Sequence, residues 1–185
     1  MIYKTMFLFC FALFVCHTAQ CAKPVKQNDS QVANAILKLG GVVKRDKTLP
    51  GSPIIEVNFQ ASSTGKVITD KDLALIQNLK HIKTLYLGYV TVTTDKGLVY
   101  LRNLKSLVKL ALPDTRITDA GLKNLQGLDN LEDLGMPFCK GITDKGLKYL
   151  RNLKKLKELN VGGTKVTDRG VAQLQKDLPN LYIIR

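Results

Sequence analysis

The sequence predicts an α/β solenoid, in which one short unit is repeated and stacked into an arc. A Thr-Asp pair recurs with its aspartate at positions 70, 95, 119, 144 and 168. An apolar series of the form LxxLxxLxL follows each of the first four pairs, and a shorter series ends the chain. The resulting spacing of 24 or 25 residues lies in the range of stacked repeat architectures.

Within one unit, two different periods predict two kinds of element. The alternating end of the series, such as Leu159 and Val161, indicates a short strand with its apolar side chains inward. The segment after the Thr-Asp pair, such as 147–153, has apolar residues at helical spacing and basic residues between them. One unit cannot bury its apolar side alone. Stacked units would place parallel strands on a concave face and helices on a convex face.

The Thr-Asp pairs are interpreted as helix starts. A threonine hydroxyl can accept an unpaired backbone N–H at a helix N-cap, and an aspartate in the first turn faces the positive end of the helix dipole. The expected N-caps are Thr69, Thr94, Thr118, Thr143 and Thr167. The alternative is a row of carboxylates that binds cations. Because capping explains every residue type, we expect no metal site and no cofactor.

The chain divides into four segments on composition. Residues 1–21 resemble a secretory signal, because Lys4 precedes an apolar run too short to span a bilayer, and Ala19 and Cys21 suit a cleavage site. We expect a flexible linker at 22–30, an N-terminal helix-strand cap at 31–52 and about five repeats at 53–185. The protein is therefore expected to be exported, as a periplasmic, envelope-associated or secreted protein. A lipid anchor at Cys21 is the alternative, although Gln20 stands where lipoprotein signals have a small residue.

Charge and cysteine content restrict the function classes. The formal net charge is +13, and loss of Lys4 with the signal leaves +12. Such a charge favours acidic partners, although a solvated lysine-rich surface is the simpler interpretation. Only Cys139 lies clear of the signal, so no internal disulfide framework is expected. An enzyme is not expected, because Cys139 has no activating base nearby in the sequence and His81 lies in another unit.

The repeated pattern resembles the leucine-rich repeat proteins, over roughly 53–185. The "ITDAGL" and "ITDKGL" segments after the strands resemble the cysteine-containing subclass, which is allied to ribonuclease-inhibitor-like repeats. The layout is similar to small exported bacterial repeat proteins. The resemblance implies a right-handed arc and a protein-recognition role. It also implies an inward Cys or Thr after each strand, at Thr91, Thr115, Cys139 and Thr164.

The concave face is the predicted partner surface, because residues between the inward leucines point outward there. One expected column is Thr84, Lys109, Asp133, Glu158 and Ile183, and the other is Asn58, Tyr86, Ala111, Gly135, Asn160 and Arg185. Exposed aromatic side chains on the strands and the adjacent rim are typical interface anchors. The predicted partner-binding residues are Tyr86, Tyr89, Lys109, Asp114, Asp133, Phe138, Glu158 and Asn160. The first hypothesis is a non-enzymatic exported module that binds another protein there.

The alternative hypothesis is binding of an anionic envelope or matrix polymer, such as a polysaccharide, or of a membrane surface. The basic residues concentrate on the expected convex side, at Lys145, Lys148, Arg151, Lys154 and Lys155. No series of aromatic residues accompanies them, so sequence-specific binding of nucleic acid is not expected. The last strand would also have an open edge, which could pair with another chain.

Overall fold

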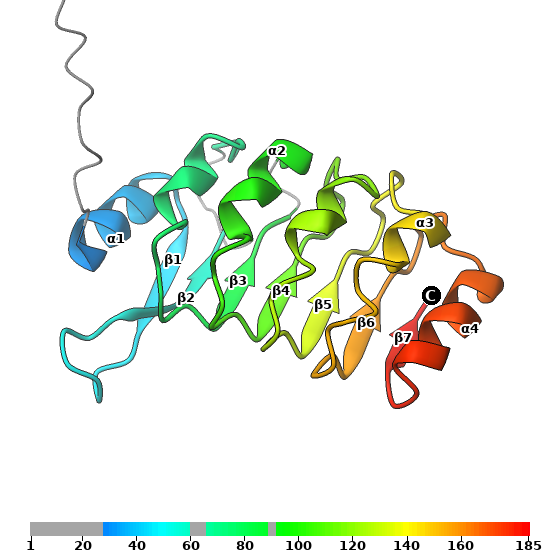
Figure 1. Cartoon of the computed structure of the whole chain (residues 1–185). Helices are drawn as coiled ribbons and strands as arrows, with labels where there is room; N and C mark the ends of the chain where they lie inside the picture. Colours follow the sequence, from blue (N-terminus) through cyan, green and yellow to red (C-terminus); the bar gives the residue numbers. More distant parts are fainter. Residues whose placement is uncertain (1–27, 60–65, 89–91) are drawn as a thin grey trace, which may run out of the picture.

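The computed structural model describes residues 28–59, 66–88 and 92–185, which form one curved stack (Figure 1). One sheet holds all the described strands in chain order. These are β1 (Val42–Arg45), β2 (Ile54–Asn58), β3 (Thr84–Tyr86), β4 (Lys109–Ala111), β5 (Asp133–Gly135), β6 (Glu158–Asn160) and β7 (Tyr182–Ile184). β1 and β2 are antiparallel, and every later pair is parallel. The predicted α/β repeat arc is confirmed.

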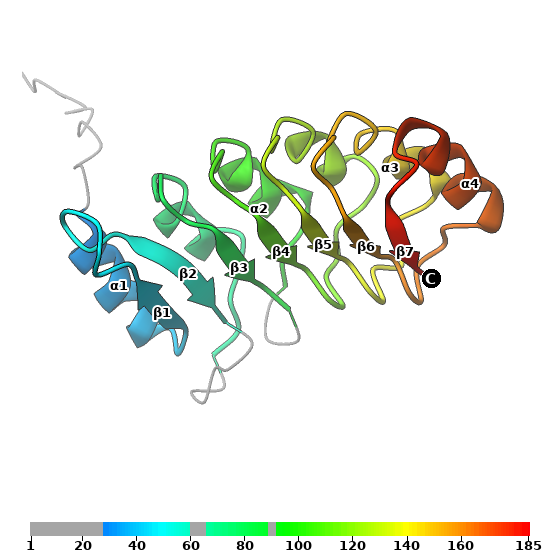
Figure 2. The ribbon, with the colours of Figure 1, turned by 90° about the horizontal axis from the view of Figure 1, so that it is seen from below.

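Helical segments cover one face of the sheet, as Figures 1 and 2 show. They are α1 (Asp29–Lys38), η1 (Asp72–Leu75), α2 (Asp95–Leu98), η2 (Val99–Leu101), η3 (Gly121–Asn124), α3 (Asp144–Leu147) and α4 (Asp168–Asp177), where η marks a 3₁₀-helix. Only α1 and α4 reach ten residues. The helices of the middle units are shorter than the apolar spacing suggests.

The LxxL spacing explains why these helices are short. In the fourth unit Leu150, Leu153 and Leu156 each donate their N–H to the carbonyl three residues earlier, at 2.9 Å. A spacing of three residues matches the period of a 3₁₀ turn, whereas an α-helix has 3.6 residues per turn. The chain therefore returns to the sheet through successive tight turns, and each turn buries one leucine in the continuous core.

The N-terminal cap begins earlier than predicted. Asn28 is the N-cap of α1, and it exchanges hydrogen bonds with Gln31 in a capping box. Residues 29 and 30, expected in the linker, are therefore helical. Asp29 ties the helix to the first repeat, because its Oδ2 accepts the N–H of Ile54 at 2.8 Å. The predicted signal, Cys21 and residues 22–27 lie outside the described residues.

The register of the last strand differs from the prediction. β7 pairs with β6 so that Ile183 lies opposite the inward Leu159, and Tyr182 and Ile184 occupy the outward positions. The prediction that Ile183 and Arg185 point outward was therefore wrong by one position. The last unit has one residue fewer between Leu181 and the strand than the units before it. A one-residue change in register moves every strand side chain to the opposite face.

Each repeat is joined to the next by an aspartate that the sequence assigned to its own helix. Asp119 Oδ1 accepts the backbone N–H of Thr143 at 2.8 Å, and its Oδ2 accepts the hydroxyl of the same threonine at 2.7 Å. The same two bonds recur at Asp70–Thr94, Asp95–Thr118 and Asp144–Thr167. We call these contacts the Asp-Thr ladder.

The hydroxyl of a ladder threonine donates to the aspartate and still accepts a backbone N–H. Thr94 and Thr143 are N-caps that accept from Lys96 and Lys145 at 3.2 Å, and Thr167 caps α4 through the N–H of Gly170. Thr118 also accepts an N–H, from Ala120, but the expectation that it caps a helix is wrong, because η3 begins at Gly121 and has no side-chain cap.

The expectation that Thr69 caps a helix is wrong. Its unit has no preceding Thr-Asp pair, so its hydroxyl donates to Asp72 Oδ2 at 2.7 Å instead. η1 starts at Asp72 and has no side-chain cap.

A glycine lies two residues after every aspartate of the series except Asp70, and it completes the ladder. A Cβ at Gly146 would overlap Asp119 Oδ1, and Gly97, Gly121 and Gly170 meet the aspartate of the preceding unit in the same way. The predicted role in close packing is therefore refined: the carboxylate occupies the space that a side chain would need.

We expect Asp119→Ala to lower the free energy of unfolding by about 2 kcal/mol, because two hydrogen bonds to a charged acceptor are lost. Gly146→Ala should cost about 1–3 kcal/mol through overpacking, and this cost should shrink in the Asp119→Ala background. Urea unfolding of the two single variants and the double variant measures the coupling. Strict additivity would contradict the ladder. Lys145→Ala, an exposed change in the same turn, should cost under about 0.5 kcal/mol.

Thr93 occupies a position where the other units have Ile68, Ile117, Ile142 or Val166. It is fully buried, and its Oγ1 has no hydrogen-bond partner among the described residues. We therefore expect Thr93→Val to raise the free energy of unfolding by about 1 kcal/mol. Thr164→Val is the matched control, since the Thr164 hydroxyl bonds both Val161 O and Val166 N. The control should be destabilised in the same urea assay, and equal effects would refute the explanation.

Candidate functional site

The sheet aligns the outward side chains of successive repeats into two columns. The first contains Glu56, Thr84, Lys109, Asp133, Glu158 and Tyr182. The second contains Asn58, Tyr86, Ala111, Gly135, Asn160 and Ile184. Neighbouring strands lie about 4.8 Å apart. Five of the predicted partner-binding residues therefore share one surface: Tyr86, Lys109, Asp133, Glu158 and Asn160.

The charges of the first column are partly paired. Lys109 Nζ lies 3.3 Å from Asp133 Oδ2. This hydrogen bond, together with the negative charge of Asp133, raises the pKa of Lys109 above its usual value. Glu158 lies beside Asp133 in the register, is exposed, and has no ion pair among the residues that the structure describes. The Glu158 carboxylate therefore remains available to a cationic group.

The second column has small residues at its centre. Ala111 and Gly135 lie between Tyr86 and Asn160 in successive strands. A Cβ placed on Gly135 would have Pro137 Cδ, 3.9 Å away, as its nearest neighbour, so the space in front of this strand is open. Asn160 Oδ1 accepts the N–H of Gly162, which leaves the amide donor facing outward. A partner side chain could therefore reach the sheet in the space between Tyr86 and Asn160.

The rim beside the strands contains an exposed and strained aromatic residue. Phe138 follows β5 with φ +63°, and Asp114 and Gly163 occupy the equivalent places in adjacent units with φ +52° and +68°. A bulky residue in the left-handed region is an outlier. The Phe138 side chain is 51% exposed. A Cβ on Gly163 would come within 2.6 Å of the ring, so the ring rests on that glycine. Tyr89, the other predicted rim aromatic, lies outside the described residues.

An open hollow of about 600 Å³ adjoins Phe138, with Asp114, Arg116 and Lys140 among its lining residues. Lys140 Nζ lies 5.9 Å from the centroid of the Phe138 ring and donates to Gly163 O at 2.7 Å. The ring is therefore held between a glycine and an ammonium group. The hollow lies against the loops that follow β4 and β5.

The convex basic residues are all exposed, but they are not equally free. Lys154 Nζ donates to the carbonyls of Arg151 and Asp177, and Lys155 Nζ donates to Asn130 Oδ1 at 2.7 Å. These two ammonium groups tie neighbouring turns together. Lys145, Lys148 and Arg151 have no ion pair in the described part of the chain. Only part of the predicted patch is therefore available to an anion.

Cys139 has a structural environment. It is buried, and its Sγ donates to Leu112 O at 3.1 Å and lies 3.2 Å from Thr115 Oγ1. Burial raises the pKa of this thiol above its usual value, which favours the unreactive neutral form. Thr115 and Thr164 likewise donate to buried carbonyls, whereas Thr91 lies outside the described residues.

Four of the five aspartates expected as the alternative cation ligands accept hydrogen bonds from the ladder threonines, and the fifth, Asp168, pairs with Arg185. Across residues 28–59, 66–88 and 92–185, no group of three or more His, Cys, Asp or Glu side chains is placed to hold a metal ion. Within the same ranges, no helix is long and apolar enough to cross a membrane.

Comparisons with known proteins agree with the repeat pattern. A family model described as "Leucine Rich repeat" matches residues 152–174. An internalin (InlF) from Listeria monocytogenes aligns with a TM-score of 0.52 and 21% identity, over 64% of this chain and 32% of the internalin. The ectodomain of the receptor kinase SOBIR1 from Arabidopsis thaliana aligns with a TM-score of 0.49 and 15% identity, over 85% and 90% of the two chains.

This chain therefore spans about a third of the InlF structure, whose similarity concerns the fold alone. No curated protein sequence matches significantly. The matching repeat model and the arc-shaped fold both support the predicted leucine-rich repeat architecture. Its assignment to the cysteine-containing subclass remains a prediction.

The ladder carboxylate of Asp144 should make the stability of the fold depend on pH. Hydrogen bonds from Thr167 hold the pKa of Asp144 below its usual value of 3.8. A depressed folded-state pKa stabilises the fold above the unfolded-state pKa, and this contribution is lost as the pH falls through the folded-state pKa. We expect Asp144→Asn to be destabilising at neutral pH, and its difference from wild type to shrink below about pH 4.

Urea unfolding at pH 7 and near pH 3 measures that difference. Asp129→Asn is the control, because Asp129 is exposed and lies outside the ladder. A destabilisation by Asp144→Asn that is independent of pH would contradict the argument.

Proposed function

We propose that this protein is a non-enzymatic recognition module that binds another protein through its concave face and the adjoining rim. The observation that carries the proposal is Phe138, which is strained and half-exposed at a place where the fold accepts glycine. Backbone strain of this kind costs about 1–3 kcal/mol and is concentrated at functional sites. The loop does not require a bulky residue at this place, since Asp114 and Gly163 occupy it in neighbouring repeats.

The partner surface has the composition of an interface. Tyr86 and Phe138 supply aromatic anchors, and the space before Gly135 can receive a protruding side chain. Glu158 supplies an unpaired carboxylate within reach of the same partner. We therefore infer a partner segment that combines an apolar side chain with a lysine or arginine. The predicted secretory signal places this encounter outside the cytoplasm.

The second candidate is an anionic polymer or surface bound by the convex face. The net charge of +13 and the exposed, unpaired Lys145, Lys148 and Arg151 favour it. The hydrogen bonds of Lys154 and Lys155 to neighbouring turns weaken this candidate, because these two ammonium groups are already engaged. The two outward columns of the concave face hold three carboxylates and one lysine, so this face does not attract such a polymer.

One experiment separates the two candidates. The chain from residue 22 onward is immobilised and used to capture proteins from an envelope extract of its own cells. A captured protein is identified by mass spectrometry, and its Kd is then measured with purified components. Phe138→Gly should weaken binding at least tenfold, about 1.4 kcal/mol. Its unfolding temperature should not fall by much, because glycine relieves the left-handed strain.

The matched control is the triple variant Lys145→Ala/Lys148→Ala/Arg151→Ala on the opposite face, which should bind the partner as wild type does. Tyr86→Ala/Glu158→Gln provides a second test on the strands. Loss of capture in the convex triple variant alone would favour the polymer or surface candidate. Unchanged capture by both concave variants would refute the proposed interface.

A further inference from the structure

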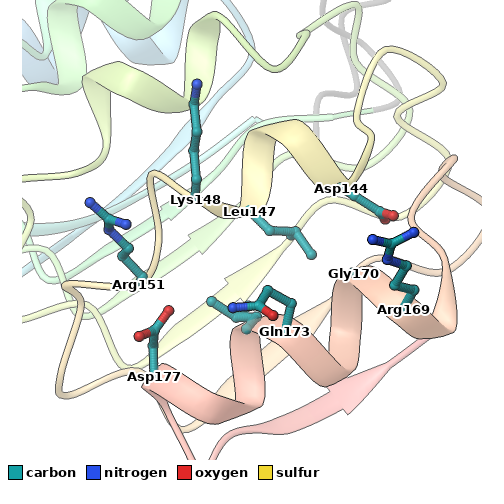
Figure 3. Close-up of a pocket in the computed structure, with 9 residues that line it drawn as sticks. Asp144, Leu147, Lys148, Arg151, Arg169, Gly170, Gln173 and Asp177 are labelled. Atoms are coloured by element: carbon teal, nitrogen blue, oxygen red, sulfur yellow. The ribbon is translucent and has the colours of Figure 1, made fainter.

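A cleft of about 270 Å³ lies between α3 and α4 on the helical side of the stack (Figure 3). It exists because α4 has ten residues and α3 has four. The later turns of α4 therefore lie beside tight turns rather than beside a helix of equal length. Leu147 and Leu174 line the cleft, and each is 3% exposed, so its floor is the edge of the core.

Cationic side chains surround this apolar floor. Figure 3 shows Arg151 at one end of the cleft and Arg169 at the other, with Leu147 between them. In the described part of the chain, neither guanidinium group has a hydrogen-bond or ion-pair partner. Lys148 also lines the cleft, with its Nζ 4.9 Å from the centroid of the Tyr149 ring.

The acidic side chains of the cleft cancel only part of this charge. Asp144 accepts the N–H and hydroxyl of Thr167, and its carboxylate also interacts electrostatically with Arg169. Asp177 has no ion pair among the described residues. Lys148, Arg151 and Arg169 therefore face two carboxylates, which leaves the cleft with one net positive charge. Arginine is suited to carboxylate, sulfonate and phosphate groups, because its planar fork can donate two parallel hydrogen bonds.

Another groove on the same face provides a comparison. The hollow near η2 and η3 is lined by Arg102, Lys105 and Lys123 together with polar residues and Gly127, and no apolar side chain lines it. This groove therefore has cationic side chains but no apolar floor. The α3–α4 cleft combines both, which is the requirement for a ligand with a charged end and an apolar body.

We propose that the α3–α4 cleft binds a small amphipathic organic anion, with its anionic group on Arg151 or Arg169 and its apolar body on Leu147 and Leu174. The volume of about 270 Å³ is just below the usual range of ligand pockets, so the ligand is no larger than about three aromatic rings or a short acyl chain. This site is separate from the partner surface on the strands. It assigns to the last two repeats a ligand that the protein-binding role does not require.

The test uses 8-anilinonaphthalene-1-sulfonate, an aromatic anion whose fluorescence rises in apolar surroundings. Titration of the protein at low ionic strength should give saturable binding at one site. Arg151→Ala/Arg169→Ala should weaken this binding at least tenfold, with an unchanged circular dichroism spectrum. Gln173→Trp keeps the cations but fills the cleft, and should also abolish binding.

The matched control is Arg102→Ala/Lys123→Ala, which removes the same charge from the groove without an apolar floor and should leave the affinity unchanged. The uncharged probe N-phenyl-1-naphthylamine should bind wild type more weakly and should not respond to the arginine changes. Equal losses in the two charge-removal variants would show general electrostatic attraction and overturn the site. Unchanged binding in Gln173→Trp would also overturn it.

Discussion

The structure depends on one interaction between neighbouring repeats. The aspartate of one repeat accepts hydrogen bonds from the backbone N–H and the hydroxyl of the threonine in the next repeat. This contact explains three residue types together. The aspartate supplies two acceptors, the threonine supplies a hydroxyl that donates to one unit while accepting from its own, and the glycine leaves room for the carboxylate. Because every unit is placed against its neighbour in the same way, the strands stay in register and their outward side chains form straight columns. The straight columns of the proposed partner surface are therefore a consequence of the ladder.

The ends of the stack show what happens where the ladder has no partner. Thr69 has no aspartate before it, so its hydroxyl turns to Asp72 and no longer caps a helix. Asp168 in the last repeat pairs with Arg185 NH2 at 2.7 Å instead of a threonine. The two ten-residue helices, α1 and α4, also stand at the ends. Stacked repeats need atypical terminal units to shield the core, and the greater length of α4 also opens the cleft against α3.

The sequence predicted the repeat, the inward leucines and the concave columns, because periodicity alone determines them. It did not reveal the ladder, since a Thr-Asp pair before an apolar segment has the same appearance whether the aspartate serves its own helix or the next repeat. The glycine two residues after the aspartate was the available indication that a group from the preceding repeat lies close to the backbone there. The LxxL spacing was sufficient to predict the 3₁₀ turns. The register of β7 could not be predicted from the sequence, because Ile183 and Ile184 are equally apolar. Only the pairing with Leu159 determines which of the two points inward.

The ladder also limits where function can be placed. Threonine, aspartate, glycine and the inward leucines are all committed to stacking, so the residues free to vary are those between the leucines and those on the loops just beyond. The loops after β4, β5 and β6 each hold a left-handed residue, and Gly163 adopts this conformation without strain. Phe138 adopts it at an energetic cost and with half of its surface in solvent. Phe138 is therefore the residue at which the proposed contact with a partner is tested most directly.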